Sequence, residues 1–234
     1  AIQVLQGHFV SKEAEYQKFC QIDILDNDQS GMIRRLQSYT ERLAHIQFYT
    51  QVEDIIKVGI ARYKDKYSPG RIADSPFVLY EKYSRRDVSL LMNCGKDLSS
   101  IMYGMKRIGD DVFIFITYHK EESQDEKNYV DGKPDYADAF EDDLIFKWDS
   151  QIGKGLDSSY MKDVLEAERK HLFVKKSDAE TSFYYMGQFD VLEARNAQKE
   201  DNRGRMQPIT KVTMKMHHAV REDLLRYLQS NITA

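Results

Sequence analysis

Hydrophobic residues recur at helical spacing in the first quarter of the chain. They lie three or four positions apart from Met32 to Ile46 and again from Val52 to Ile60, which is the period of an amphipathic helix. Asp28 stands just before the first of these stretches, where a side-chain oxygen can cap the free backbone N–H groups of a helix. The pattern therefore predicts two helices before residue 66.

Pro69, Gly70 and Pro76 interrupt this helical pattern. Proline and glycine clusters of this kind mark loops and element boundaries. We therefore expect a helical lead-in or coupling subdomain over residues 1–70 and an α/β recognition domain over residues 71–234.

Beyond this boundary the apolar runs become short and rich in β-branched and aromatic residues, which is typical of strands. They lie at residues 99–108, 111–120, 144–151, 170–176, 181–194 and 208–216. Short helices are predicted at residues 84–95, 158–170 and 219–231. Because few helices separate the strands, we expect an α+β fold with a mixed, mostly antiparallel sheet curled toward a barrel.

Charge is distributed unevenly along the chain. The net charge is −4, but residues 121–143 hold ten acidic residues and two lysines, which leaves +4 for the remainder. A basic face beside an acidic loop is one interpretation, and ordinary solvated surfaces are the other. The chain has no apolar run of roughly 20 residues and no signal-peptide pattern at its start, so we expect no membrane partner and a cytoplasmic location.

Motifs for common catalytic chemistry are missing from the sequence. Cys20 and Cys94 lack the spacing of a zinc site, and no phosphate-binding glycine loop occurs. His217 and His218 with Glu222 could bind a metal, but surface or packing roles are commoner. The segment Glu168–Lys170 with the acids of the 121–143 segment leaves a nuclease as a weaker alternative. We expect no cofactor, no metal and no catalysis.

Aromatic residues that lie next to polar residues are the most informative candidates for a binding site. Trp148, Asp149, Ser150 and Gln151 follow one another, combining a flat wall for a flipped base with groups that can read its edge. Aspartate is suited to accept a hydrogen bond from the cytosine amine. The alternative is that these are ordinary core and turn residues.

Several segments carry a family resemblance, covering mainly residues 80–187. They are YSRRDVSLLM, IMYGMKRI, FKWDSQ, HLFVKK and FYYMGQ. In this order and spacing they resemble a helicase-associated domain, formerly of unknown function, at the C-terminal end of SauUSI-type Type IV restriction endonucleases.

The resemblance implies a non-catalytic module that recognises 5-methylcytosine or 5-hydroxymethylcytosine in duplex DNA. It also implies partner domains in the parent chain, a phospholipase-D-like nuclease and a DEAD-box-type helicase. By analogy with other readers of modified cytosine, an SRA-like or PUA-like sheet that flips the base is expected.

Ten residues are predicted to contact the modified base or the DNA backbone. They are Tyr83, Arg85, Arg86, Tyr103, Lys106, Trp148, Asp149, Ser150, Gln151 and Tyr184. The alternative function is a protein-interaction or oligomerisation module, in which the N-terminal helices pair with the helicase or with a second copy of the chain.

Overall fold

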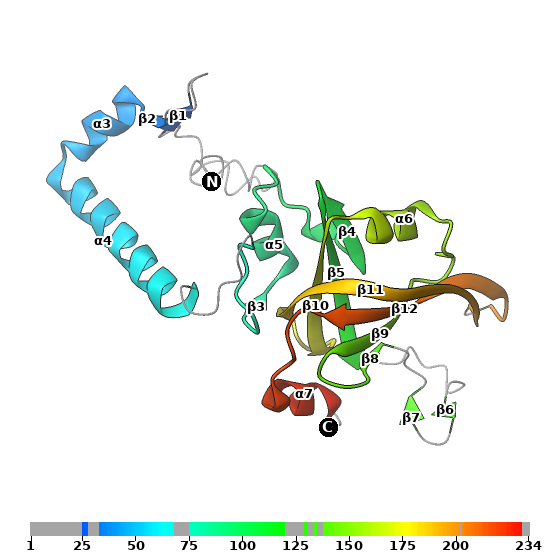
Figure 1. Cartoon of the computed structure of the whole chain (residues 1–234). Helices are drawn as coiled ribbons and strands as arrows, with labels where there is room; N and C mark the ends of the chain where they lie inside the picture. The colour runs from blue at the N-terminus through cyan, green and yellow to red at the C-terminus, as the bar shows by residue number, and fades with distance from the viewer. Residues whose placement is uncertain are drawn as a thin grey trace. The chain divides into compact units, whose positions relative to one another are not determined.

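The computed structural model describes seven stretches of the chain (Figure 1). They are residues 25–27, 33–67, 75–119, 129–130, 133–134, 138–201 and 203–230. The chain divides into two compact units, one of Ala1–Val78 with Arg85–Ser99 and one of Leu79–Ser84 with Ser100–Ala234. The subdomain boundary expected near residue 70 stays a prediction.

The first unit is mainly helical. Its elements are β1 (Leu25–Asn27), β2 (Ile33–Arg35), α3 (Gln37–Leu43), α4 (Ile46–Arg62), the π-helical turn η2 (Tyr63–Tyr67) and α5 (Arg85–Leu91). The first predicted helix starts later than expected, because residues 33–35 pair with residues 25–27 as antiparallel strands. Strand pairing gives their backbone groups the partners that the first turn of a helix would leave free. Asp28, the predicted cap, lies outside the described residues.

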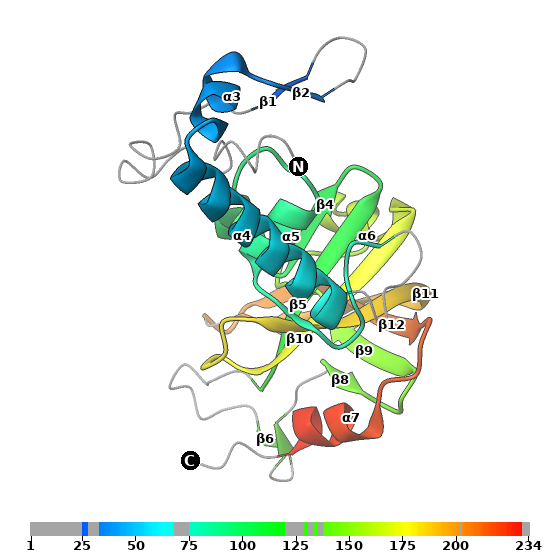
Figure 2. The same ribbon diagram turned by 90° about the vertical axis from the view of Figure 1, so that its left-hand side faces the viewer.

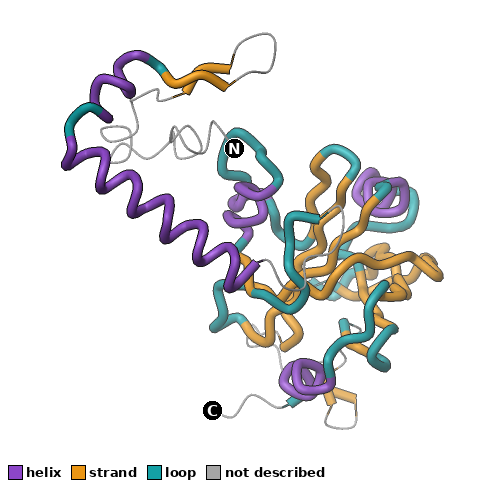
Figure 3. The backbone as a smooth tube through the Cα atoms, turned by 60° about the vertical axis from the view of Figure 1, so that its left-hand side comes forward, coloured by secondary structure: helices purple, strands orange, loops and turns teal. Residues whose placement is uncertain are grey.

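The second unit is built on an eight-stranded sheet with the order β4-β5-β10-β11-β12-β9-β8, in which β3 also pairs with β11. The strands are β3 (Lys82–Tyr83), β4 (Met105–Ile108), β5 (Asp111–His119), β8 (Ala139–Phe140), β9 (Ile145–Asp149), β10 (Arg169–Ser177), β11 (Phe183–Glu200) and β12 (Met206–Met216). The turn η3 (Ser99–Ile101) precedes β4, and a separate pair, β6 (Tyr129–Val130) and β7 (Lys133–Pro134), lies between β5 and β8. Helices α6 (Ser159–Glu166) and α7 (Glu222–Gln229) lie at opposite ends of this unit (Figure 3).

The predicted fold class is confirmed. The sheet is mixed and mostly antiparallel, since only β5 and β10 run parallel. The predicted curl is too strong: β4 and β8 form two open edges, and the sheet is not strongly curled (Figure 2). A closed barrel would require those two edge strands to pair.

Strand β11 bends twice along its length. Its register shifts against β10 at Met186, and it shifts against β12 at Leu192. Each shift leaves one residue of β11 without an opposite partner, which is a β-bulge that bends the strand and increases its twist. Between the two bulges β11 leaves β10 and joins β12.

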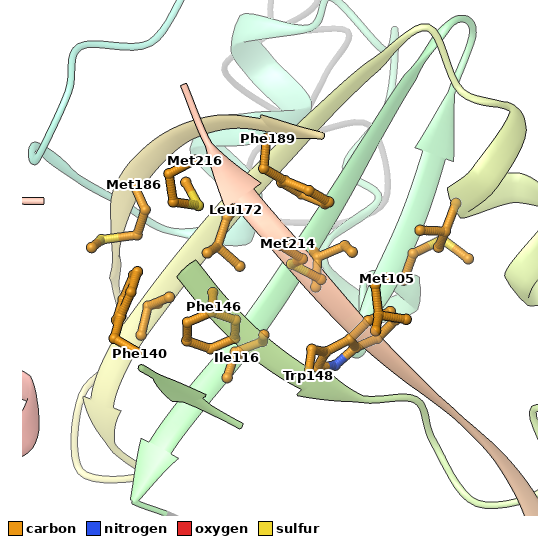
Figure 4. Packing of buried hydrophobic residues seen from close by; sticks show 14 of the residues in the cluster. Met105, Ile116, Phe140, Phe146, Trp148, Leu172, Met186, Phe189, Met214 and Met216 are labelled. Carbon is orange, nitrogen blue, oxygen red and sulfur yellow. The ribbon is translucent and has the colours of Figure 1, made fainter. Parts of the chain in front are cut away.

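One face of the sheet carries the main core (Figure 4). Alternate side chains of β5, β9, β10 and β12 point into a single cluster, as the period of a strand requires. Ile116, Leu172, Phe146 and Met214 are buried members from these four strands. Helices α6 and α7 cover part of the cluster with apolar residues, among them Met161 and Leu228.

The opposite face of β5, β10 and β11 carries a second buried layer, made of aromatic rings. The rings of Phe113 and His171 stack at 4.9 Å, and the rings of Phe173 and Tyr185 lie 4.9 Å apart. This layer ends at Asp111, a buried carboxylate opposite Arg169 in the parallel register.

Asp111 is the centre of a charged network. Arg169 donates to both carboxylate oxygens from Nε and Nη2, each at 2.8 Å. His171 Nε2 lies 2.9 Å from Asp111 Oδ1, and His171 Nδ1 lies 2.9 Å from the Tyr185 hydroxyl oxygen. Burial by itself raises the pKa of Asp111, but the hydrogen bonds from His171 and Arg169 outweigh it and hold the pKa below the ordinary value of 3.8. The ionised carboxylate is therefore the form that the fold stabilises.

Replacing Asp111 with asparagine should lower the free energy of unfolding by about 2–3 kcal/mol at pH 7, since charge-assisted bonds to a buried partner are lost. The folded-state pKa of Asp111 is depressed, so its contribution is complete above the unfolded pKa of roughly 4 and disappears as the pH falls through the folded pKa. Urea unfolding at pH 7 and pH 3 should show the gap between the two proteins narrowing at the lower pH.

The matched control for this test is Asp110→Asn, which changes an exposed aspartate in the adjacent turn. It should alter stability by less than about 0.5 kcal/mol at either pH. Equal effects of the two substitutions would show that Asp111 stabilises the fold no more than a surface carboxylate does.

Candidate nucleic-acid interface

The loop that joins β9 to α6, residues 150–158, is fastened to strand β12. Ser150 N donates to Thr210 O at 2.9 Å, and Thr210 N donates back to Ser150 Oγ at 2.8 Å. Gly153 N donates to Pro208 O at 2.9 Å. Since these bonds involve backbone groups of a strand, the first half of the loop is held in a fixed position on the sheet edge.

The second half of the loop is fastened to β11 and to the start of α6. Leu156 N donates to Asn196 Oδ1 at 2.8 Å. Ser158 caps α6, because its Oγ accepts from Met161 N at 3.3 Å. The Asn196 side chain thus joins a strand to a loop that lies 40 residues earlier in the sequence.

A second loop, preceding β4, contacts the first. Gln151 Nε2 donates to Tyr103 O at 3.2 Å. Gly104 has a φ of +73°, and a Cβ atom there would lie 2.5 Å from Gln151 Nε2. The positive φ favours glycine, and a side chain at Gly104 would also displace the Gln151 amide from its bond to Tyr103 O.

A cavity of about 620 Å³ opens between the β9–α6 loop and the β11–β12 hairpin. This volume falls within the range of roughly 300–1,000 Å³ found for small-molecule sites. Its lining residues are Gly153, Gly155, Leu156, Asp157, Ser158, Asn196, Ala197, Gln198 and Pro208. Two glycines, a carboxylate, a hydroxyl and two amides give this cavity both backbone and side-chain groups for hydrogen bonds.

Large apolar side chains stand exposed beside the cavity. Tyr103 is 64% exposed, and Ile152, which precedes the cavity residue Gly153, is 46% exposed. They come from the two loops joined through Gln151. The Gln151–Tyr103 contact therefore places an aromatic and an aliphatic side chain on neighbouring loop tips.

The structure divides the predicted run from Trp148 to Gln151: Trp148 and Asp149 line a second cavity of about 400 Å³, and Ser150 and Gln151 do not. Trp148 is only 4% exposed and belongs to the core, where its ring lies 6.3 Å from that of Tyr160. Asp149 points to the other face of β9, as strand alternation requires, and lies 3.3 Å from Lys211 Nζ. Ser150 is buried, and its Oγ accepts a hydrogen bond from Thr210 N on β12. Gln151 donates a hydrogen bond to Tyr103 O.

The remaining predicted residues lie elsewhere. Tyr83 is buried against Phe173, and Tyr184 lies beneath Lys82 Nζ, which is 4.5 Å from its ring centroid. Lys106 lies half-buried on β4, opposite Phe113 in the strand register. Arg85 and Arg86 belong to α5 in the first unit, where Arg86 Nε lies 3.5 Å from Asp97 Oδ2. DNA contact by these residues stays a prediction.

Basic side chains on the outer face of β9, β11 and β12 are paired with acids. Lys147 lies 3.4 Å from Glu141, and Lys211 lies 3.3 Å from Asp149. Arg195 lies 3.8 Å from Glu193. These pairs neutralise much of the positive charge that the sequence places on these strands.

Sequence reasoning missed most of the cavity. Asn196 and Gln198 are polar residues of an exposed strand, a pattern that carries no functional signature by itself. The available signal was the pair of glycines, Gly153 and Gly155, directly after the predicted site, because glycine marks loops where backbone groups approach closely.

No helix in the described part of the chain is long and apolar enough to cross a membrane. Within the same residues, no group of three or more histidine, cysteine, aspartate and glutamate side chains is placed to hold a metal ion.

The fold and cavity define an α+β domain with a polar cavity at a strand–loop junction. Residues 77–228 match the family described as "Domain of unknown function (DUF3427)". The match covers more than half of the 234 residues, so the chain belongs to this family. No curated protein matched the sequence.

Solved structures show weaker likenesses. The chain is similar to SUVH6 of Arabidopsis thaliana, with 11% identity, a TM-score of 0.37, and coverage of 67% of this chain and 30% of that one. It is similar to the MspJI restriction endonuclease in complex with an oligonucleotide, with 10% identity, a TM-score of 0.32, and coverage of 53% and 40%. It is also similar to the sulfur-binding and SRA domains of ScoMcrA with phosphorothioated DNA, with 10% identity, a TM-score of 0.35, and coverage of 90% and 70%.

SRA domains, the fold expected by analogy, are thus among the matches. The TM-scores are low, and the chain spans less than half of the first two matched chains. The function of this chain must therefore be argued from its own residues.

Replacing Trp148 with alanine should lower the free energy of unfolding by about 3–5 kcal/mol, because it empties a large buried site in the core. Urea denaturation followed by circular dichroism would measure this. Lys147→Ala, on the exposed side of the same strand, is the matched control and should cost less than about 1 kcal/mol. A Trp148→Ala protein as stable as its parent would show that the indole lies outside the core.

Proposed function

We propose that this chain is the non-catalytic DNA-reading module of a modification-dependent restriction endonuclease. It binds duplex DNA that contains 5-methylcytosine or 5-hydroxymethylcytosine and flips the modified base out of the stack. The helicase and nuclease domains of the parent chain are its functional partners. The observation that carries this proposal is the 620 Å³ cavity bounded by Gly153–Ser158 and the β11–β12 hairpin.

The chemistry of the cavity suits a nucleobase. A cytosine presents an amine donor and carbonyl and ring-nitrogen acceptors, and Asp157 can accept from the amine. Asn196, Gln198 and the backbone of the glycine loop offer complementary donors and acceptors. We propose that these residues, in place of the Trp148–Gln151 run, form the hydrogen bonds to the base. Ser150 and Gln151 of that run instead hold the loop through their bonds to Thr210 and Tyr103.

The exposed loop tips suit the other requirement of base flipping. A flipped base leaves a gap in the stack, and proteins that unstack DNA insert apolar side chains between base steps. Tyr103 and Ile152 are exposed and lie on loops in mutual contact beside the cavity. One site thus combines a receptor for the base with side chains able to occupy the gap.

One observation on the sequence agrees with this function. The segments of this chain from residue 80 to residue 187 resemble the C-terminal domain of SauUSI-type enzymes, which implies a module that recognises modified cytosine.

The chain should bind a duplex with one central 5-methylcytosine or 5-hydroxymethylcytosine at least about tenfold more tightly than the cytosine duplex, a difference of about 1.4 kcal/mol. Tyr103→Ala should weaken binding of the modified duplex by about 1–3 kcal/mol, the usual value of an aromatic side chain stacked on a base. Ile152→Ala should also weaken binding, because it removes an apolar side chain able to fill the gap. Fluorescence anisotropy at fixed moderate salt measures both effects.

The matched control is Leu192→Ala, which removes a side chain that is 57% exposed at the β11 bulge. It should bind like the parent. Equal affinity for all three duplexes would contradict the reader function. DNA cleavage by the chain with Mg²⁺ or Mn²⁺ would contradict its non-catalytic part and favour the nuclease alternative.

A second function, self-association, is favoured by helix α4. Its large apolar side chains are exposed, including Ile46 at 74% and Ile55 at 72%. None of its described side chains is buried. A helix with this composition needs a partner surface.

A second copy of the chain fits the spacing of this helix. Residues of this helix recur at alternating spacings of three and four positions, the period of a coiled-coil seam. The seam residues are the exposed Ile46, Tyr49, Ile56, Ile60 and Tyr63 and the partly buried Glu53. In an antiparallel pair this spacing is symmetric, so Ile46 faces Tyr63 and Tyr49 faces Ile60 in two aromatic–aliphatic layers, and Glu53 faces Ile56 in the central layer.

The chain should therefore form dimers that Ile56→Asp/Ile60→Asp separates into monomers, because each substitution would bury a charge without a cationic partner in the seam. Light scattering over a range of concentrations measures the mass. Asp54→Ala, on the same helix but outside the seam, should remain dimeric. A parent protein that is monomeric at all concentrations would rule out this second function.

A further inference from the structure

The far end of the β11–β12 hairpin extends beyond the strands that flank it (Figure 1). Strand β9 pairs with β12 only from Lys211 to Lys215, and β10 pairs with β11 only as far as Gln188. From Asn196 to Glu200, β11 pairs with β12 alone among the described strands. Residues 198–201 and 203–207, hereafter the ribbon, are thus a two-stranded element.

The tip of the ribbon is held by one carboxylate. Asp201 Oδ1 accepts from Arg203 N at 2.9 Å and from Arg205 N at 3.0 Å, and Asp201 Oδ2 accepts from Arg205 Nε at 3.0 Å and Nη2 at 2.9 Å. The hydrogen bond from the Arg205 backbone amide is the main cause that lowers the pKa of Asp201 to about 2. At neutral pH the ionised carboxylate therefore joins Arg203 and Arg205 to the end of β11, which supports a two-stranded hairpin that would otherwise be marginal in water.

An ordered hairpin loses less conformational freedom when it binds a partner. The side chains available for binding are cationic and amide groups: Lys199, Arg203, Gln198 and Gln207. Lys199 and Arg203 form no ion pair with any described residue, whereas Arg205 is engaged by Asp201. Free cations of this kind contact phosphates, and glutamine side chains bond to base edges.

The outer edge of β12 is closed to a further strand. Pro208 has no N–H to donate, and its carbonyl already accepts from Gly153. Addition of a peptide strand along this edge is therefore disfavoured. The ribbon instead has the shape of an element that inserts as a whole, because its two strands lie about 4.8 Å apart and a major groove about 12 Å wide admits such a pair.

We propose that the ribbon enters a groove of the DNA duplex next to the flipped base, with Lys199 and Arg203 on phosphates. This inference rests on the proposed DNA-reading function. The ribbon and the cavity are continuous, since Gln198 belongs to both and Pro208 stands at their junction. A base in the cavity therefore lies at the root of the ribbon, and the duplex that carries this base runs along it.

The test is Lys199→Ala/Arg203→Ala in the full chain, titrated against the 5-methylcytosine and cytosine duplexes at several salt concentrations. Both affinities should fall by about tenfold or more, and equally, because phosphate contacts are independent of sequence. The slope of log K against log salt should become shallower by about 2, since each phosphate contact contributes about 0.9.

The matched control, Lys57→Ala/Arg62→Ala, removes the same charges from α4 in the first unit. It should leave affinity and salt slope unchanged. A ribbon variant that binds like the parent overturns the inference but leaves the reader function standing, and so does a loss confined to the modified duplex. A parent chain that binds no duplex overturns both.

Discussion

The second unit depends on strand β11, which changes its main pairing partner along its length. The first part of β11 pairs with β10, and its last part, from Phe189 onward, pairs with β12. The bulges at Met186 and Leu192 provide the bend that this change of partner needs. Because a slip of one residue would turn every side chain to the opposite face, the position of the main core determines where Asn196 and Gln198 lie. The cavity is thus a consequence of how β11 is registered against its neighbours.

A second constraint fixes the parallel pair β5–β10, in which the opposite residues Asp111 and Arg169 lie 58 residues apart in the sequence. Asp111 and Arg169 are directly opposite in its register, and His171 links the same carboxylate to Tyr185 on β11. A buried ion pair contributes little net stability compared with apolar residues, but any other register would leave Asp111 buried without its cation. We therefore infer that the Asp111 network favours the observed register of β5, β10 and β11 over other registers.

The sequence predicted local features well and spatial ones poorly. The strand positions could be predicted because burial of one face imposes a period of 2, and α4 could be predicted because its apolar residues recur at helical spacing, although none of its described side chains is buried. The pairing of β5 with β10 could not be predicted, since the four strands β6 to β9 and helix α6 come between them along the chain. The burial of Trp148 could also be predicted from the sequence. Phe146 and Trp148 lie on one face of the strand, and the polar residues Lys147 and Asp149 lie on the other. Tyr103 and Gln151 were chosen by composition, and the structure brings them into contact. Asn196 could not be found, because its bond to Leu156 exists only once the loop is placed on β11.

Energetics constrain how such a site reads a methyl group. One buried methyl contributes roughly 0.8 kcal/mol, whereas unstacking a base costs a few kcal/mol. The methyl group therefore cannot drive flipping, and the free energy must come from contacts that cytosine and 5-methylcytosine share. Much of the positive charge on the outer strands is already neutralised by acids, so in the proposed function this free energy would come from exposed apolar tips and from Lys199 and Arg203, which pair with no described acid. Affinity and discrimination would then arise in different places: the loop tips and the ribbon would open and hold the duplex, and the cavity at the root of the ribbon would test the base.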